Sequence, residues 1–225
     1  MNKTLISTLF IFMFVFASMV QAGTWEYDFT KANGDTWTKD WQVIAGKFDL
    51  KDGALWQTTA SADDNNVFSC LAVTGWEIGD GTIEAKVMHH GAGLNDALIF
   101  YRMKDNDNGY ASRLQLDSYI TIGKITAGKH AHIKYTANPV VAEKLYTIKI
   151  VLAGPKITVS VDDKELVTAE DTFSSKGKVG FGMSRCAGGA SLQYIKVTGT
   201  DVTGLTSVDS ADKLATTWSE IKVSR

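Results

Sequence analysis

The sequence has little excess charge and few prolines or cysteines. Its 225 residues carry 23 Lys and Arg against 25 Asp and Glu, a formal net charge of −2. Such a chain lacks the excess of basic residues that neutralises many phosphates, so we expect no nucleic-acid partner. Two prolines against 20 glycines indicate many turns rather than stiff linkers. The length and the 44% hydrophobic content fit one globular domain with a short appendage.

The chain also lacks the short motifs that identify common enzyme classes. No G-x-S-x-G, HExxH, Walker loop or Rossmann glycine pattern occurs. The pairs His89-His90 and His130-x-His132 offer two metal ligands each without a third. The acidic segments 63–66 and 105–108 could coordinate calcium but do not have EF-hand spacing. We therefore expect no cofactor and no metal, and calcium binding has no support.

Residues 1–22 have the features of a secretory signal peptide. Lys3 precedes an apolar run that ends at Val20, and small side chains lie three positions before and one position before a cut after Ala22. The run is shorter than the roughly 20 residues of a membrane-spanning helix. We expect a secreted or periplasmic protein that has no membrane attachment after cleavage.

Two cysteines remain after this cut, Cys70 and Cys186. An exported chain meets an oxidising compartment, in which a disulfide between them would form and persist. It would close a loop of more than 100 residues, which chain-entropy arguments value at up to about 4–5 kcal/mol. We predict this bridge, with two separate buried thiols as the alternative, because spacing carries no information about geometry.

The pattern of most of the mature chain predicts short strands separated by turns. Apolar and polar side chains alternate in four clear segments, 83–87, 146–152, 157–161 and 179–183. This period of two gives each strand one buried and one solvated face, which is typical of an antiparallel sandwich or barrel. Between two further runs lies Asn108-Gly109, a pair that readily takes the positive φ angles of a tight hairpin turn.

The last 25 residues differ in character. In the tail, residues 201–225, Leu214, Trp218 and Ile221 fall at i, i+4 and i+7, the spacing of one helical face. We predict a short amphipathic C-terminal helix. It could dock on the sandwich or bind a protein partner.

Several segments, in chain order, resemble the concanavalin A-like superfamily of legume lectins, laminin G-like modules and bacterial glucanases. The similar segments are Trp41 to Leu55 with its W, G and DG-x-L spacing, Gly81-Thr-Ile-Glu-Ala-Lys-Val87, the hairpin from Ala97 to Tyr110, and closing strands up to Val197. The resemblance implies an all-β fold for residues 23–200, a two-sheet antiparallel jelly-roll sandwich, followed by the short helix.

The carboxylates of that superfamily's enzymes are missing. Glycoside hydrolases on this fold commonly carry two or three acids at alternate positions of one strand, so that acid and nucleophile flank the scissile bond. Here Glu84 is followed by Lys86 and Met88 at the alternate positions. Gln193 stands where the family often has a calcium-binding Asp. The departures favour a module without catalysis.

The concave sheet face is the candidate binding surface. If Ile83, Ala85 and Val87 face the core, polar neighbours on the same strands face the other way. The predicted carbohydrate-binding residues are Glu84, Lys86, His90, Arg102, Tyr110, Arg113, Gln115 and Asp117. Arg, Gln, Glu and Asp offer the planar hydrogen-bonding groups that sugar hydroxyls need, and Tyr110, Tyr119 or Trp76 could stack on a sugar at the rim. An ordinary solvated face is the alternative.

The sequence therefore predicts an exported carbohydrate-recognition module that binds a polysaccharide or other glycan. Two other functions stay open. One is a divergent glycoside hydrolase similar to the 3-keto-disaccharide hydrolases, with Glu84, Arg102 and His90 as its polar cluster. The other is a laminin G-like protein-interaction module.

Overall fold

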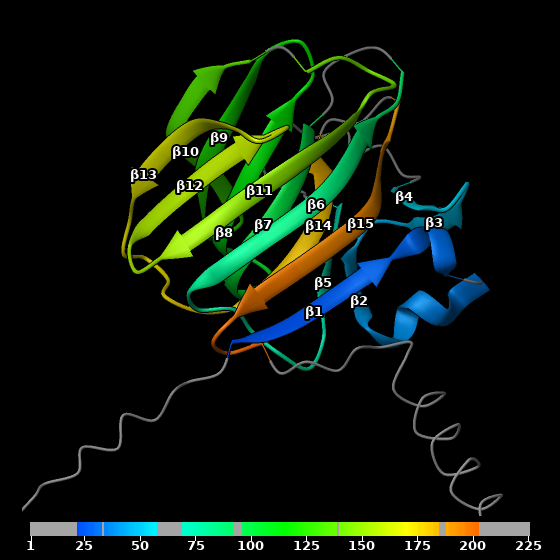
Figure 1. The fold of residues 1–225 in the computed structure, drawn as a ribbon, viewed down its shortest axis with the longest axis horizontal. Coiled ribbons are helices and arrows are strands. Elements are labelled where there is room, and N and C mark those ends of the chain that lie inside the picture. The colour runs from blue at the N-terminus through cyan, green and yellow to red at the C-terminus, as the bar shows by residue number, and fades with distance from the viewer. Residues whose placement is uncertain are drawn as a thin grey trace, which may run out of the picture.

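The computed structural model describes residues 22–32, 34–57, 69–91, 96–138, 140–184 and 188–202. These residues form two antiparallel sheets packed face to face (Figure 1). The predicted all-β sandwich is confirmed. The signal peptide, apart from Ala22, lies outside the described residues, as do Cys186 and the predicted C-terminal helix, so those three expectations stay predictions. No helix among the described residues is long and apolar enough to cross a membrane.

The described strands divide into a sheet of eight and a sheet of seven. The eight-stranded sheet runs in the order β13 (Lys164–Glu170), β12 (Lys156–Val161), β11 (Leu145–Ala153), β6 (Gly81–His89), β15 (Ala190–Gly199), β4 (Ala54–Gln57) and β3 (Phe48–Lys51), with β1 (Gly23–Asp28) also paired to β15. The seven-stranded sheet runs in the order β10 (Lys129–Ala137), β9 (Tyr119–Thr126), β8 (Asn108–Gln115), β7 (Asp96–Asp105), β14 (Lys178–Ser184), β5 (Ser69–Val73) and β2 (Trp41–Ala45). Two short 3-10 helices, η1 (Phe29–Lys31) and η2 (Gly34–Lys39), follow β1.

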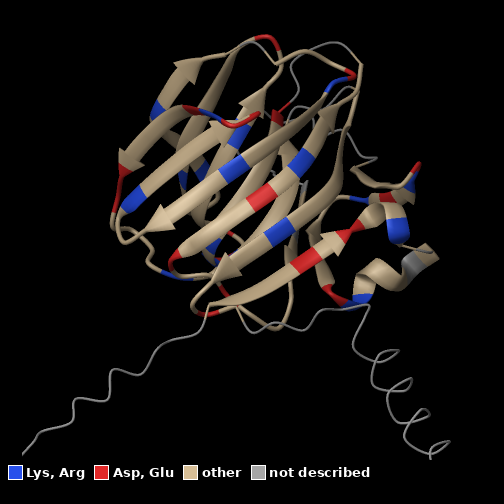
Figure 2. Ribbon diagram, in the orientation of Figure 1, with Lys and Arg blue, Asp and Glu red and all other residues tan. Residues whose placement is uncertain are grey.

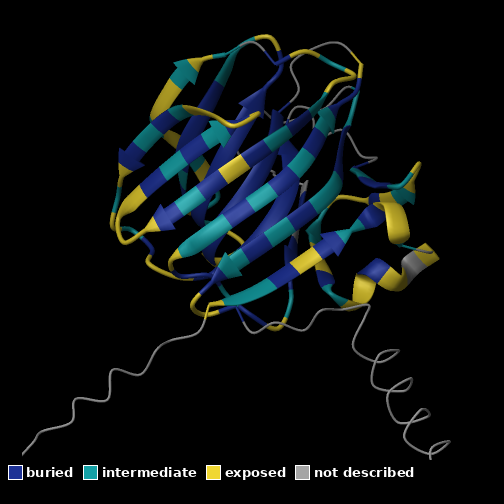
Figure 3. Ribbon diagram, in the orientation of Figure 1, coloured by how far each residue is buried: buried dark blue, intermediate teal, exposed yellow. Residues whose placement is uncertain are grey.

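The apolar side chains of both sheets meet in one core. Ile83, Ala85 and Val87 of β6 are fully buried there, as the alternation predicted. Burying each large aliphatic side chain contributes about 1.5–3 kcal/mol, so this shared layer is the main source of stability. Figure 3 shows the consequence along the eight-stranded sheet, where buried and partly exposed residues alternate.

The outer face of the eight-stranded sheet carries charges of alternating sign. Lys149 of β11 pairs in register with Glu84 of β6, Glu84 with Lys196 of β15, and Lys196 with Glu26 of β1 (Figure 2). Opposite charges at directly facing positions of neighbouring strands stabilise a sheet modestly. This face therefore has the pattern of an ordinary solvated sheet surface.

The hairpin between β7 and β8 forms, but its turn lies before the predicted Asn-Gly pair. Asp105 pairs with Asn108, so Asn106 and Asp107 make the turn and neither has a positive φ. The Asp105 carboxylate accepts hydrogen bonds from the Asp107 amide at 2.8 Å and from the Asn108 side chain. The prediction of a positive-φ turn at Asn108-Gly109 is wrong, because this Asp-centred turn closes the hairpin instead.

Arg102 holds one end of the sandwich together. The pairing of β7 with β8 shifts register after Tyr101, and Arg102 has a φ of 48°. Such a bulge re-aims a side chain. The Arg102 guanidinium, 1% exposed, donates to the backbone carbonyls of Gly79, Gly154 and Ser174 and to the Asp80 carboxylate at 2.9 Å. The side chain thus links three separate loops.

This arrangement predicts a large stability loss when Arg102 is replaced by Met. The variant leaves buried carbonyls without a donor, so the free energy of unfolding should fall by about 3 kcal/mol or more. Lys176→Met is the matched control, because Lys176 makes a surface pair with Glu77 at 3.6 Å and should change stability by less than about 1 kcal/mol. Urea unfolding of both variants measures the difference. Equal losses would contradict the structural role of Arg102.

Candidate functional site

The outer face of the seven-stranded sheet carries a buried polar group at one end of β7, β8 and β14. Asp96 of β7 pairs in register with Gln115 of β8 on one side and with Ser184 of β14 on the other. One row further along, Arg113 of β8 pairs with Thr121 of β9. The neighbouring residues on the strands face the core, so these five side chains share the outward side.

An ion pair forms the centre of this group. Arg113 Nη1 lies 3.3 Å from Asp96 Oδ2, with 7% and 1% of the two side chains exposed. The Ser184 hydroxyl donates to the same carboxylate oxygen at 2.7 Å. Because the arginine and the aspartate balance one another, the centre presents hydrogen-bonding groups without a net charge.

Three buried polar atoms around the ion pair have no hydrogen-bond partner among the described residues: Arg113 Nε, Gln115 Oε1 and Thr121 Oγ1. Buried polar groups are nearly always hydrogen-bonded, and leaving one unpaired costs about 1–3 kcal/mol. A donor, an acceptor and a hydroxyl therefore lie together, buried and without a partner among the described residues.

An aromatic cluster lies beside the polar group, on the edge strand β10 and its neighbour β9. The Tyr119 ring centroid lies 5.3 Å from that of His132 and 5.7 Å from that of Tyr135, while His130 and His132 are 5.2 Å apart. Tyr135 is 63% exposed and presents its ring to solvent. The His130 ring lies over Gly123, where the Cβ of any other residue would meet it. We call Tyr119, His130, His132 and Tyr135 the aromatic platform.

Both histidines of the platform are uncharged at neutral pH. Burial and, to a smaller extent, the nearby positive charge of Arg113 together lower the pKa of His130 from 6.5 to about 3. Burial and Arg113 also lower the pKa of His132, although Asp96 acts in the opposite direction. Among the described residues, no group of three or more His, Cys, Asp or Glu side chains could hold a metal ion. The platform therefore offers aromatic faces rather than cations.

The structure brings only part of the predicted site together. Arg113 and Gln115 lie side by side on this face, although Arg113 is buried rather than exposed as expected. Glu84 and Lys86 belong to β6, in the other sheet. The prediction that these four residues share one face is wrong, because alternation along a strand fixes its two sides but not the sheet that it joins.

Two further predicted residues are internal. The Arg102 guanidinium is hydrogen-bonded to the loop carbonyls described above. Tyr110 is fully buried, and its hydroxyl donates to Asp171 at 2.7 Å and accepts from the Ser174 amide. Trp76, suggested as a rim aromatic, lies in the core with its ring 5.2 Å from that of Trp25. The expectation that these side chains reach the binding face is wrong, because internal hydrogen bonds hold Arg102 and Tyr110 and packing in the core holds Trp76.

The remaining two lie at strand ends. Asp117 is exposed in the turn after β8, where its amide donates to the Val140 carbonyl. His90 follows β6 and contacts Glu143 and Ser191, away from the aromatic platform. Neither shares the surface of Arg113.

Sequence reasoning missed Asp96, Thr121 and Ser184. Asp96 and Ser184 are 88 positions apart, so their contact depends on the pairing of β7 with β14, which no local pattern reveals. Thr121 carried a usable signal, since it alternates with the apolar Ile120 and Ile122 immediately after Tyr119.

Comparisons with solved structures establish the fold. The carbohydrate binding module CBM66 from Bacillus subtilis has a TM-score of 0.62 and 19% identity, over 70% of this chain and 94% of that chain. A Bacillus licheniformis beta-glucanase has a TM-score of 0.58 and 14% identity, over 78% and 97% of the two chains. The Emp46p carbohydrate recognition domain has a TM-score of 0.58 and 12% identity, over 79% and 96%. The fold is a concanavalin A-like jelly roll. No family model and no curated protein sequence matches the chain.

The lowered histidine pKa values predict acid sensitivity. An unfolded histidine takes up a proton near its ordinary pKa of 6.5, whereas folded His130 does so only near 3 and folded His89 near 4. The contribution of these two histidines to the free energy of unfolding is therefore fully present above pH 6.5 and decreases as the pH falls below that value. The decrease is about 1.4 kcal/mol per pH unit for each extra proton that the unfolded state binds. Urea unfolding between pH 7.5 and 4.5 should show a shallower loss for His130→Gln than for the wild type. Parallel curves would show that His130 is not buried as described.

Proposed function

We propose that this protein is an exported carbohydrate-recognition module that binds a glycan, without catalysing its cleavage, on the outer face of its seven-stranded sheet. The observation that carries the proposal is the meeting of unpaired buried polar atoms with an exposed aromatic platform. Sugars present hydroxyl groups at their edges and C–H groups on their faces. Directed donors and acceptors next to an aromatic ring complement both surfaces.

The charge balance of the site favours a neutral glycan. Asp96 offsets the charge of Arg113, and the platform histidines are neutral. A fixed arginine–carboxylate pair can donate to one hydroxyl and accept from its neighbour, which suits a vicinal diol. The printed names of similar solved structures, a carbohydrate binding module and a carbohydrate recognition domain, support the same class of ligand.

The proposed absence of catalysis rests on the acids of this face. Retaining glycosidases place two carboxyl groups about 5–5.5 Å apart, and inverting enzymes place them about 6.5–9.5 Å apart. On the described strands of the seven-stranded sheet, Asp96 is the only acid away from the hairpin end at Asp105. Asp96 is itself held by Arg113 and Ser184. A second catalytic carboxylate has no position on these strands.

Replacing Tyr135 by Ala tests the platform. A glycan array on the purified protein first identifies a binding polysaccharide, and calorimetry then measures the dissociation constant. Tyr135→Ala should weaken binding about tenfold, equivalent to about 1.4 kcal/mol, because the stacking ring is lost. The melting temperature should barely change, since Tyr135 is mostly exposed.

Tyr194→Ala is the matched control, because Tyr194 is a partly exposed tyrosine on the outer face of the eight-stranded sheet. Its affinity should equal that of the wild type. Weaker binding in Tyr194→Ala with normal binding in Tyr135→Ala would place the site on the opposite face. Release of sugar from a bound polysaccharide would contradict the proposed recognition function and would favour the glycoside hydrolase alternative.

A further inference from the structure

A chain of hydrogen bonds joins three side chains at the end of the eight-stranded sheet. Ser191 lies on β15, His90 directly follows β6, and Glu143 lies in the turn that precedes β11. Ser191 Oγ is 2.9 Å from His90 Nε2, and His90 Nδ1 is 3.1 Å from Glu143 Oε2. Each distance is within hydrogen-bond reach, and the imidazole lies between the hydroxyl and the carboxylate.

Backbone contacts hold the Glu143 carboxylate of this hydrogen-bond chain in place. Glu143 Oε1 accepts from the Gly91 amide at 3.0 Å, while the Glu143 amide donates to the His89 carbonyl at 2.8 Å. Glu143 also has a φ of 57°, a left-handed conformation that non-glycine residues adopt infrequently and that here forms part of the turn before β11. These contacts connect the turn to the end of β6 and fix the carboxylate against His90.

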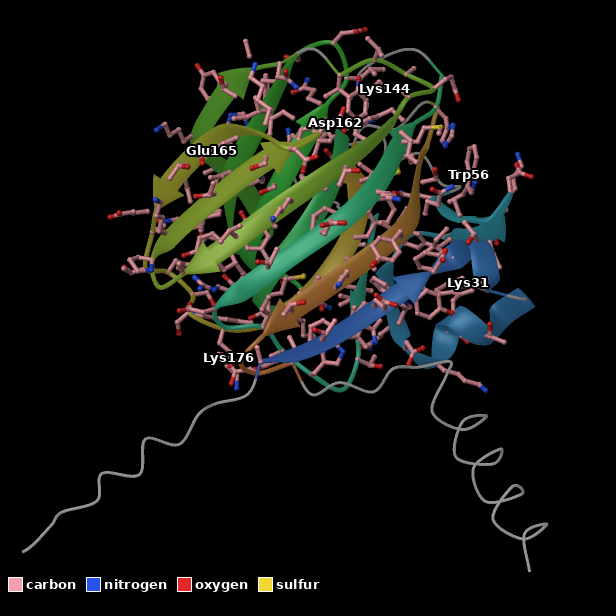
Figure 4. The ribbon with its side chains drawn as sticks, in the orientation of Figure 1. Lys31, Trp56, Lys144, Asp162, Glu165 and Lys176 are labelled. Atoms are coloured by element: carbon pink, nitrogen blue, oxygen red, sulfur yellow. The ribbon has the colours of Figure 1, made fainter. Side chains whose placement is uncertain are left out.

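The imidazole is fixed as well. Its ring stacks on Trp56 with centroids 3.6 Å apart and an angle of 16° between the planes. Trp56, labelled in Figure 4, pairs in register with Ser191. The His90 amide donates to the Gly189 carbonyl at 2.9 Å. Because the carboxylate faces Nδ1, the proton of neutral His90 belongs on Nδ1, and the lone pair of Nε2 faces the serine hydroxyl.

We infer that Ser191, His90 and Glu143 form a serine–histidine–glutamate relay that makes Ser191 a nucleophile toward small acyl esters. A serine hydroxyl is weakly nucleophilic alone and is activated by a base that a third group orients. Here His90 is the base and Glu143 is the positioning residue, which stabilises the imidazolium once it forms. This activity is separate from the proposed glycan site, because its residues belong to the other sheet.

The chemistry of the step balances within the three side chains, an ester and water. Ser191 Oγ bonds to the acyl carbon, and His90 Nε2 takes the hydroxyl proton. The ester C–O bond then breaks, and the proton passes from Nε2 to the departing alkoxide. Water, deprotonated by the same nitrogen, attacks the acyl carbon, and the proton returns to Oγ as the acyl group leaves.

Burial limits the size of the acyl group. Ser191 is 4% exposed and His90 is 9% exposed, whereas 62% of the Glu143 side chain is exposed. The relay therefore reaches the surface at Glu143, and because Ser191 itself is almost covered, we expect only the smallest acyl groups to reach it. Acetyl esters are the expected substrate class.

A small alkyl fluorophosphonate tests the nucleophile directly, because it modifies activated serines. The purified protein should gain one label by intact mass, and peptide mapping should place it on Ser191. Ser191→Ala should gain none, while the control Ser160→Ala, which removes a serine on β12 of the same sheet, should be labelled like the wild type. A label elsewhere, or no label on a protein whose unfolding curve is normal, would overturn the relay.

Hydrolysis of p-nitrophenyl acetate separates the positioning role of Glu143 from a structural one. Glu143→Gln keeps the side-chain volume but loses the charge that orients and stabilises His90. The variant should lose tenfold or more in kcat while KM stays nearly constant, since Glu143 does not touch the ester. An unchanged kcat would show that the three residues only fasten the turn to the sheet.

Discussion

Every strand of the sandwich gives one side to the core between the two sheets, and this constraint decides where polar chemistry can lie. Side chains such as Ile83 of β6 and Leu114 of β8 fill that shared layer. Most polar groups are left with the two outer faces and the strand ends. The inward-facing hydroxyls are accommodated by hydrogen bonds: Tyr101 and Ser112 lie 3.1 Å apart between the sheets, and Tyr110 reaches Asp171 at one end of the sandwich.

The two outer faces differ in how their polar groups are satisfied. On the eight-stranded sheet, residues such as Glu84 and Lys196 are partly exposed and lie opposite one another, so water and the neighbouring charge satisfy both. On the seven-stranded sheet, Arg113 and Gln115 are buried beside apolar side chains such as Leu98, and some of their polar atoms have no partner among the described residues. The second arrangement is costly unless a ligand or water completes it, which is why we assign recognition to that face.

Local sequence patterns predicted the strands well and the sites poorly. The alternation of Ile83 and Val87 was sufficient to place β6, because burial on one side acts at every second residue. The prediction that Glu84 and Arg113 lie on one face was wrong. The sheet that a strand joins depends on long-range pairing, and the periodicity of the strand carries no information about that pairing. The prediction for Arg102 was wrong for a local reason. The irregularity in strand pairing after Tyr101 directs the Arg102 side chain, which was expected on the outer face, into the end of the sandwich. Similarly, the contact of His90 with Ser191 joins residues 101 positions apart.

The central claim is that ligand binding belongs to the outer face of the seven-stranded sheet. Hydroxyl-radical footprinting with and without a bound polysaccharide tests it residue by residue. The account predicts protection of Tyr119, His132 and Tyr135, with unchanged oxidation of Tyr194 on the opposite sheet. Protection of Tyr194 with unchanged oxidation of the aromatic platform would contradict it.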